Sequence, residues 1–449
     1  MIGLGKLGLF TLLAVIYVFL LSEDMAVMVF VIFIPIPIFI QLGVIGENWI
    51  RIIPGDLLLV LLLMRTLTQK QLKVPSGPVT LPLLSVILLG FLTLGKASLL
   101  LKATIVGLLS YLQSLKFLSY LLVALIFVHT TTQLKKITTT ILVSCTFYTI
   151  FINWQRMKVV GLANIMTAHP MRGALFTGGH HLLFGWPGFY ALFCAMIVLF
   201  SFAVFLRSQK HFPKFVAFMA MISAFLPVIY SGSRTSYLCL IVGLIIMALR
   251  GKLHEKFIVF GAVLFLIVYF PHAIEYTFEG PAKQFGLDRS TYSRLMILKE
   301  SFKVVLSEPL LGYGYNRFRI IVADFFDVKS LFSSAHNLYL RLLVKNGILG
   351  LLAYFWLIKV VLERTYKVYK ITRDQYLRSI AFGFICCSIG MLASNFTQSN
   401  LFYETTAAFF WFMGGAFAVL SNQLNNRELV QPYPEVQPVN GSKDSCEAG

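Results

Sequence analysis

The stretch SSAHNLYLRLLVKNGILGLLAYF, residues 333–355, begins like a membrane-spanning helix but carries polar residues inside its apolar run. His336 and Asn337 stand at its start, and Arg341 and Lys345 follow one and two turns later. Positions i, i+4 and i+8 of a helix share one face, so Asn337, Arg341 and Lys345 would form a polar stripe ~12 Å long. Such a stripe in a membrane helix should face a protein cavity and not lipid. The stretch therefore predicts a transmembrane helix that lines a polar site within a helical bundle.

The composition of the whole chain extends this prediction to the fold. The chain has 449 residues, of which 58% are hydrophobic and 13% are charged, and its mean hydropathy is +0.80. A soluble domain of this size has too little interior to bury so much apolar surface. Runs of ~20 apolar residues recur along the chain, and each is long enough to cross the ~30 Å hydrocarbon core of a bilayer. We therefore predict an all-α, polytopic integral membrane protein.

Apolar runs and basic loops together predict the topology. The expected spans are residues 7–21, 25–41, 55–68, 79–95, 105–128, 136–153, 182–206, 213–230, 235–249, 256–271, 337–362, 376–397 and 404–420. Short basic loops, such as the one with Arg250, Lys252 and Lys256, should lie in the cytoplasm. This gives thirteen spans, but Pro35 and Pro37 favour an interfacial or re-entrant early segment, so we expect about 12 spans. Because such loops hold most of the cations, the net charge of +19 does not indicate a nucleic-acid partner.

The spans divide the chain into membrane segments, outer loops and a tail. The predicted segments are N-terminal transmembrane helices at 1–153, an outer loop at 154–181, central transmembrane helices at 182–271, a large outer loop at 272–336, C-terminal transmembrane helices at 337–420 and a disordered cytoplasmic tail at 421–449. Within the large loop, apolar residues from Tyr292 to Leu306 recur near helical spacing, with Ser290 available as a cap and Pro309 as a stop. A short amphipathic helix on the outer surface is expected there.

The predicted outer segments carry more positive charge than outer loops usually do. Residues 154–181 contain Arg156, Lys158 and Arg172 and no acidic residue. An anionic ligand such as a phosphate or pyrophosphate would explain these cations, and snorkelling to lipid headgroups is the structural alternative. The histidines of this segment lack the spacing of zinc ligands, and the chain has no Cys-x-x-Cys pair, so no metal site is expected.

Three arginines are candidates for binding the anion. Arg234 lies in the very short turn of YSGSRTSYL, residues 230–238, at the outer rim of the bundle, where a bidentate phosphate fits its planar guanidinium. An ordinary interface arginine is the alternative. Arg294 lies on the amphipathic helix, where it is either a ligand or a solvated charge. Arg172 is a weaker candidate beside glycines that allow close approach of the backbone.

His336 is the candidate for proton transfer, since an imidazole can take a proton from a hydroxyl near neutral pH. Asn337 and Arg341 are expected to support it, with helix capping by Asn337 and snorkelling by Arg341 as the structural alternatives. Gly347 and Gly350 are expected to permit close packing of helices below the polar residues.

These residues together resemble the bacterial O-antigen ligases and the related O-antigen and exopolysaccharide polymerases. The pattern His-Asn, nine residues, Gly-x-x-Gly runs from His336 to Gly350. It is accompanied by a Ser-x-Ser-Arg turn that ends at Arg234 and by an Arg at position 294 ahead of Pro-Leu-x-Gly-x-Gly at 309–314. The resemblance covers mainly residues 170–400.

The resemblance implies an activity and a role for each motif. Members of this superfamily transfer a glycan from an undecaprenyl-diphosphate carrier to an acceptor hydroxyl at the outer face of the inner membrane, without metal or other cofactor. Arg234 and Arg294 would hold the diphosphate, Arg172 would be a further contact, and His336 would activate the acceptor with inversion at the sugar. The implied partners are the lipid-linked glycan, an acceptor glycan or lipid A-core, and the bilayer.

Several alternatives stay open at this point. No outer Arg has Gly eleven positions later, a pattern seen in some polymerases, and this favours a ligase over a polymerase only weakly. A lipid flippase or transporter would require internal repeats and titratable groups near the midplane. A membrane acyltransferase would leave the outer arginines unexplained. Asp288 or Glu308 could replace His336 as the base.

Overall fold

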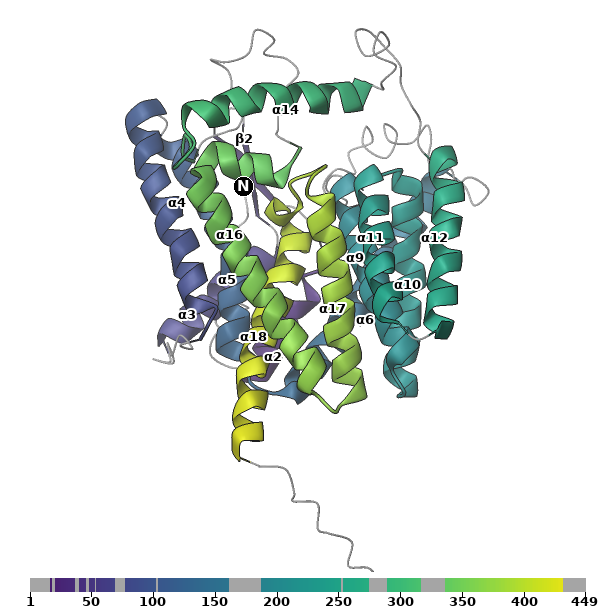
Figure 1. Ribbon diagram of the computed structural model, residues 1–449. Coiled ribbons are helices and arrows are strands. Elements are labelled where there is room, and N and C mark those ends of the chain that lie inside the picture. The colour runs from purple at the N-terminus through teal and green to yellow at the C-terminus, as the bar shows by residue number, and fades with distance from the viewer. Residues whose placement is uncertain are drawn as a thin grey trace, which may run out of the picture.

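Long helices that run side by side form the body of the molecule in the computed structural model (Figure 1). The structure describes residues 17, 21–36, 40–45, 48–52, 54–68, 77–101, 104–160, 187–251, 253–273, 289–315 and 336–430. Arg172 and Asp288 lie outside these ranges. Their predicted roles therefore stay predictions.

The elements before residue 210 are α2 (Glu23–Ile32), β1 (Ile40–Ile45), β2 (Asn48–Ile52), α3 (Pro54–Thr68), α4 (Thr80–Leu101), α5 (Thr104–Phe127), α6 (Thr131–Val160) and α9 (Pro187–Arg207). The later elements are α10 (His211–Ser231), α11 (Arg234–Arg250), α12 (Leu253–Ala273), α14 (Arg289–Ser307), α16 (Leu338–Ile371), α17 (Gln375–Ser394), the short 3-10 helix η3 (Asn400–Phe402) and α18 (Glu404–Val430).

Eight of the described helices are long and apolar enough to cross a membrane: α4, α5, α6, α9, α10, α16, α17 and α18. Each of them matches a span expected from the sequence. The protein is thus a multi-pass helical membrane protein, as predicted. The count of about 12 spans and the outer position of the large loop remain predictions.

The structure departs from the predicted fold near both ends of the described chain. The expected span at 25–41 contains only the ten-residue α2, and an antiparallel hairpin of β1 and β2 follows it, so the predicted long helix is wrong for this segment of an otherwise helical fold. Proline offers no N–H to a helix and crowds the preceding turn, which explains why α2 does not continue past Pro35. At the other end α18 continues to Val430, so the predicted disordered tail is wrong for residues 421–430.

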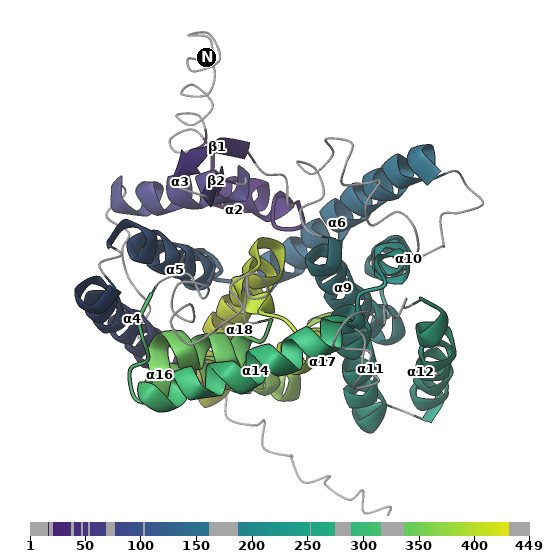
Figure 2. The same ribbon diagram turned by 90° about the horizontal axis from the view of Figure 1, so that it is seen from above.

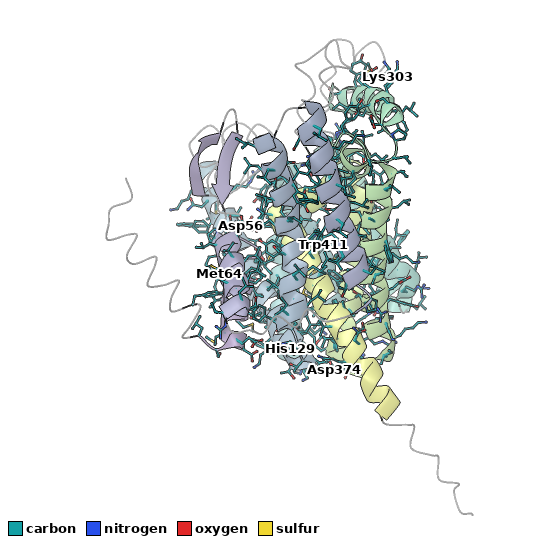
Figure 3. The ribbon with its side chains drawn as sticks, turned by 90° about the vertical axis from the view of Figure 1, so that its left-hand side faces the viewer. Asp56, Met64, His129, Lys303, Asp374 and Trp411 are labelled. Carbon is teal, nitrogen blue, oxygen red and sulfur yellow. The ribbon has the colours of Figure 1, made fainter. Side chains whose placement is uncertain are left out.

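Aromatic side chains fill the centre of the bundle between α9, α17 and α18. The ring of Phe384 lies 5.8 Å from that of Phe410 and 5.4 Å from that of Phe417. Trp411 is buried near mid-height (Figure 3). Because lipid tails are as apolar as these side chains, close packing rather than exclusion of water holds such helices together.

α14 lies across one end of the bundle, over α16 and α17 and toward α11 (Figure 2). We call this end the α14 end; Lys303 lies there, and His129 and Asp374 lie at the opposite end (Figure 3). The helix was predicted, but it begins at Arg289, so Ser290 lies in its first turn and is not the cap. Its side chains Ile297, Ser301 and Val304 are buried. The expected apolar residues Leu295, Phe302 and Leu306 are exposed.

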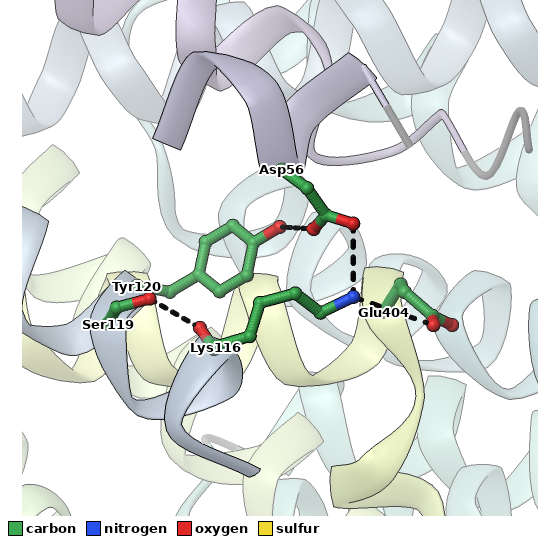
Figure 4. Close-up of polar contacts among 5 residues, drawn as sticks. All are labelled: Asp56, Lys116, Ser119, Tyr120 and Glu404. Carbon is green, nitrogen blue, oxygen red and sulfur yellow. Dashed lines mark hydrogen bonds and ion pairs between the residues drawn. The ribbon is translucent and has the colours of Figure 1, made fainter. Parts of the chain in front are cut away.

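A cluster of charges links α3, α5 and the start of α18 inside the bundle (Figure 4). The Lys116 ammonium lies 3.1 Å from Asp56 and 3.7 Å from Glu404, and the Tyr120 hydroxyl donates to Asp56 over 3.3 Å. The three charged side chains are 12–20% exposed. One cation thus compensates two carboxylates that would otherwise repel each other in a medium of low polarity.

Replacing Lys116 by methionine should destabilise the protein by about 3 kcal/mol, because it leaves two partly buried carboxylates without a cation. Thermal unfolding in detergent measures the effect. Lys359→Met is the control, because the ion pair of Lys359 with Glu363 is exposed and should contribute less than about 1 kcal/mol. Equal melting temperatures for the two variants would show that the cluster does not stabilise the bundle.

Candidate active site

The candidate site lies at the α14 end, where α11, α14 and α16 come together. A tight turn places Arg234 as the first residue of α11, and Gly232 makes the turn possible with a φ of 57°. The Nη1 group of Arg234 donates a hydrogen bond to the hydroxyl of Thr291 over 3.0 Å. Arg234 is therefore held against the first turn of α14, 57 positions away in the sequence.

Arg294 follows Thr291 by three positions on α14, so the two residues lie on the same side of that helix. His336, just before α16, is within electrostatic reach of Arg294. Burial and, second, the positive charge of Arg294 lower the pKa of His336. The structure thus brings Arg234, Arg294 and His336 into one region, although the first and last are about a hundred positions apart.

His336 has an unusual backbone conformation, with a φ of 44°. A non-glycine residue in this region is uncommon and is often found at functional sites. The surrounding chain holds it there: the N–H of Leu338 donates to the carbonyl of Asn395 over 2.9 Å. The side chain of Asn395 in turn accepts from the N–H of Asn400 over 3.0 Å. The end of α17 therefore anchors the segment that carries His336.

Asn337 caps α16, as its structural alternative predicted. Its side-chain oxygen accepts from the N–H of Leu340 over 3.0 Å, which satisfies one of the free donors at the start of the helix. That oxygen is occupied by this bond. Asn337 therefore supports His336 by fixing where the helix begins.

Arg341 and Lys345 point into the bundle. The Arg341 guanidinium lies 4.4 Å from the centre of the Phe402 ring, and its Nε has no hydrogen-bond partner among the described residues. Lys345 is 4% exposed, and its ammonium donates to the hydroxyl of Ser110 over 2.8 Å. Within the described ranges, neither cation has a carboxylate within 4 Å.

Gly347 has a different role from the one expected. Its φ of 63° and ψ of −168° break α16, and the segment from Pro309 to Gly314 packs into the break. The N–H of Ile348 donates to the carbonyl of Pro309 over 2.8 Å, and the N–H of Gly314 donates to the carbonyl of Lys345 over 2.7 Å. The expectation of close helix packing is wrong for Gly347, because its neighbour is this loop.

The two glycine motifs therefore form one backbone joint. The N–H of Tyr313 also donates to the carbonyl of Val344 over 2.9 Å. A Cβ on Gly312 would lie 2.7 Å from the nitrogen of Gly347, and a Cβ on Gly350 would overlap the side chain of Asn346. The joint sets the position of the first turns of α16 relative to α14, and with it the position of His336.

Three residues that hold candidate site residues in position were not predicted from the sequence. Thr291 binds Arg234, Asn395 anchors the His336 segment, and Lys96 forms an ion pair with Glu308. The only sequence signals were a lysine at the end of one apolar run and an asparagine at the end of another. Glu308, the alternative base, is thus bound to a lysine of α4.

The pH dependence of activity should reveal the effect of the Arg294 charge on the pKa of His336. The predicted general base, His336, must be neutral to accept a proton, so we expect activity to be lost as pH falls through its pKa. Arg294→Gln removes a positive charge that lowers this pKa, so the pKa should rise and the acid limb of the rate profile should move to higher pH. Profiles of kcat/KM against pH measure the shift. Lys299→Gln, on the exposed side of α14, should leave the limb in place; a shift of equal size there would contradict the local coupling.

Comparison with known proteins finds a match in the part of the chain that contains the candidate site. Residues 218–355 match a family model described as O-antigen ligase. The match runs from α10 through the first half of α16 and includes Arg234, Arg294 and the His336–Gly350 pattern. No curated protein matches the chain.

Proposed function

Since residues 218–355 place this chain in the O-antigen ligase superfamily, we propose that it transfers a glycan from undecaprenyl diphosphate to an acceptor hydroxyl. The chain is a membrane enzyme of the glycan-transferring kind. The proposal adds the identity of the glycan donor and acceptor and the roles of the site residues. The reaction would take place at the outer face of the inner membrane, with a glycan or lipid A-core as acceptor.

The convergence of Arg234, Arg294 and His336 carries the proposal. Two guanidinium groups and one imidazole come from three helical segments that are distant in the sequence, yet they meet at one end of the bundle. Arginine has the planar fork that fits phosphate oxygens. A lipid-linked diphosphate would bring anionic groups to such a site at the membrane surface.

The proposed reaction is a direct displacement at the anomeric carbon. The acceptor oxygen forms a bond to this carbon while the bond from the carbon to the diphosphate oxygen breaks, which inverts the configuration. The acceptor proton passes to His336, and undecaprenyl diphosphate leaves with the electron pair of the broken bond. Arg234 and Arg294 would stabilise the negative charge that builds on the leaving group, an effect that is strongest where water is scarce.

The electrostatics of His336 suit the role of base. Burial and Arg294 disfavour the imidazolium, so the ring stays neutral and can accept a proton near neutral pH. The same positive charge favours the anionic leaving group. One arginine therefore assists both ends of the proposed displacement.

A transfer assay tests the proposal and separates its alternatives. The purified protein in nanodiscs is given an undecaprenyl-diphosphate-linked glycan with or without a lipid A-core acceptor, and the products are separated on a gel. One shifted band that requires the acceptor supports a ligase, whereas a ladder formed without acceptor supports a polymerase. Movement of the lipid across the bilayer without a covalent product would contradict both and support a flippase.

A further inference from the structure

Arg341 has no carboxylate partner among the residues that the structure describes. No ion pair or hydrogen bond joins its guanidinium to another side chain of the described ranges, and the partner that the structure gives it is the ring of Phe402. Lys345 lies one turn deeper on the same face and bears the same charge, compensated by the Ser110 hydroxyl and, at 5.6 Å, the Tyr315 ring. Two like charges thus share one face of α16.

Several other buried or half-buried cations of the described ranges are paired with carboxylates, whereas Arg65 donates to the carbonyl of Tyr17 and Arg156 lies over the ring of Tyr230. Lys116 lies between Asp56 and Glu404, and Arg207 lies 2.9 Å from Glu255, which is 2% exposed. Moving a cation out of water costs several kcal/mol. A ring contact returns about 0.5–2 kcal/mol and a hydrogen bond to a charged group about 1.5–3 kcal/mol. Neutral partners therefore leave the Arg341–Lys345 pair under-compensated.

The position of the pair relates it to the candidate site. Arg341 follows Asn337 by four positions, so it lies ~6 Å further along α16 than the residue that adjoins His336. It faces into the bundle, while Arg234 and Arg294 lie at the α14 end. A lipid-linked diphosphate has two phosphates in line, one next to the sugar and one next to the lipid chain. A ligand whose sugar-side phosphate meets Arg294 would direct its lipid-side phosphate toward the membrane interior.

We propose that Arg341, reinforced by Lys345, binds the lipid-side phosphate of the substrate, while Arg234 and Arg294 bind the phosphate next to the sugar. This inference rests on the proposed function. It divides the diphosphate between two pairs of cations and makes Arg341 a residue that selects for lipid-linked substrates. The phosphate of a bilayer phospholipid has the same chemistry. The test must therefore distinguish a phosphate of an undecaprenyl lipid from a phosphate of a bilayer phospholipid.

Lipid binding tests the division without requiring catalysis. The protein is placed in nanodiscs of zwitterionic lipid, and its affinity for undecaprenyl diphosphate, undecaprenyl monophosphate and phosphatidylglycerol is measured. Arg341→Gln should weaken binding of both undecaprenyl lipids about tenfold or more, because both carry the lipid-side phosphate. Arg294→Gln should weaken binding of the diphosphate and leave that of the monophosphate nearly unchanged.

Arg364→Gln is the matched control, since Arg364 lies on the same helix near its other end and bonds to Asn422. It should bind both lipids as the wild type does. If Arg341→Gln does not fold, Arg341→Lys serves as a second variant, because it keeps a cation over Phe402. It should weaken the binding of both undecaprenyl lipids about fivefold, since lysine lacks the planar guanidinium that fits two phosphate oxygens. Wild-type affinity for both lipids in the folded Arg341 variant, or a loss confined to phosphatidylglycerol, would overturn the inference.

The assays also separate this inference from the proposed function. If the wild type transfers glycan and the Arg341 variants bind both lipids normally, the function stands and the inference fails. If the lipids bind through Arg341 but no glycan is transferred, the inference stands and the function fails. Absence of binding of either lipid to the wild type would overturn the inference directly.

Discussion

Replacing His336 by alanine is expected to lower glycan transfer by about 10²–10⁴-fold, the usual contribution of a general base. The acceptor hydroxyl would then lose its proton to water alone, while the proposed diphosphate ligands Arg234 and Arg294 remain in place. The affinity for undecaprenyl diphosphate should therefore change little. The rate of transfer at saturating donor, measured with purified protein in nanodiscs, gives the effect.

The backbone of His336 requires a second variant, because a φ of 44° strains most side chains. Asparagine tolerates this conformation but cannot act as a base near neutral pH. His336→Asn should thus fold like the wild type and lose as much activity as His336→Ala. His211→Ala, at the exposed start of α10, is the control for loss of a histidine and should be fully active. An asparagine variant as active as the wild type would eliminate His336 as the base.

Replacing Gly347 by alanine is expected to destabilise the protein by about 2–6 kcal/mol. The combination of φ 63° and ψ −168° is open almost only to glycine, which accounts for roughly 1–3 kcal/mol. The added Cβ would also overlap the carbonyl of Leu310 and lie 2.6 Å from the nitrogen of Leu311, and overpacking of this kind costs a further ~1–3 kcal/mol. Both neighbouring atoms belong to the backbone, so they cannot turn away.

Gly95→Ala is the matched control for this substitution. Gly95 lies within α4, and a Cβ placed there meets nothing within 4 Å. Alanine should stabilise that helix by up to about 1 kcal/mol. Thermal unfolding in detergent therefore should show opposite signs for the two variants. A Gly347 variant as stable as the wild type would mean that the joint between α16 and residues 309–314 is not rigid.

The joint and the site are coupled through α16. His336 and Asn337 precede the first turns of this helix, which are fixed on one side by Asn395 and on the other by the loop that fills the break at Gly347. The glycine motifs at 312–314 and 347–350 thus have a structural role that their spacing did not reveal. They hold the segment that carries His336 in place from a distance of about three turns.

The amino-acid sequence was enough to predict a helical membrane fold, the places of the eight membrane-length helices that the structure describes and a resemblance to the O-antigen ligases. These follow from local properties: the length of an apolar run sets whether a helix can cross a bilayer, and three short motifs carry the resemblance. Local properties also predicted Arg234, Arg294 and His336 as site residues, because each belongs to one of the short motifs of the resemblance.

How these residues come together depends on the tertiary structure. The bond from Arg234 to Thr291, the anchoring of Leu338 by Asn395 and the sharing of Lys116 between Asp56 and Glu404 join residues that are more than fifty positions apart. Such pairings depend on how the helices pack, and helix packing leaves no periodic signal in a single sequence. The break at Gly347 was hidden for the same reason: a glycine in an apolar run fits close helix packing as well as a left-handed joint, and only the loop that fills it distinguishes the two.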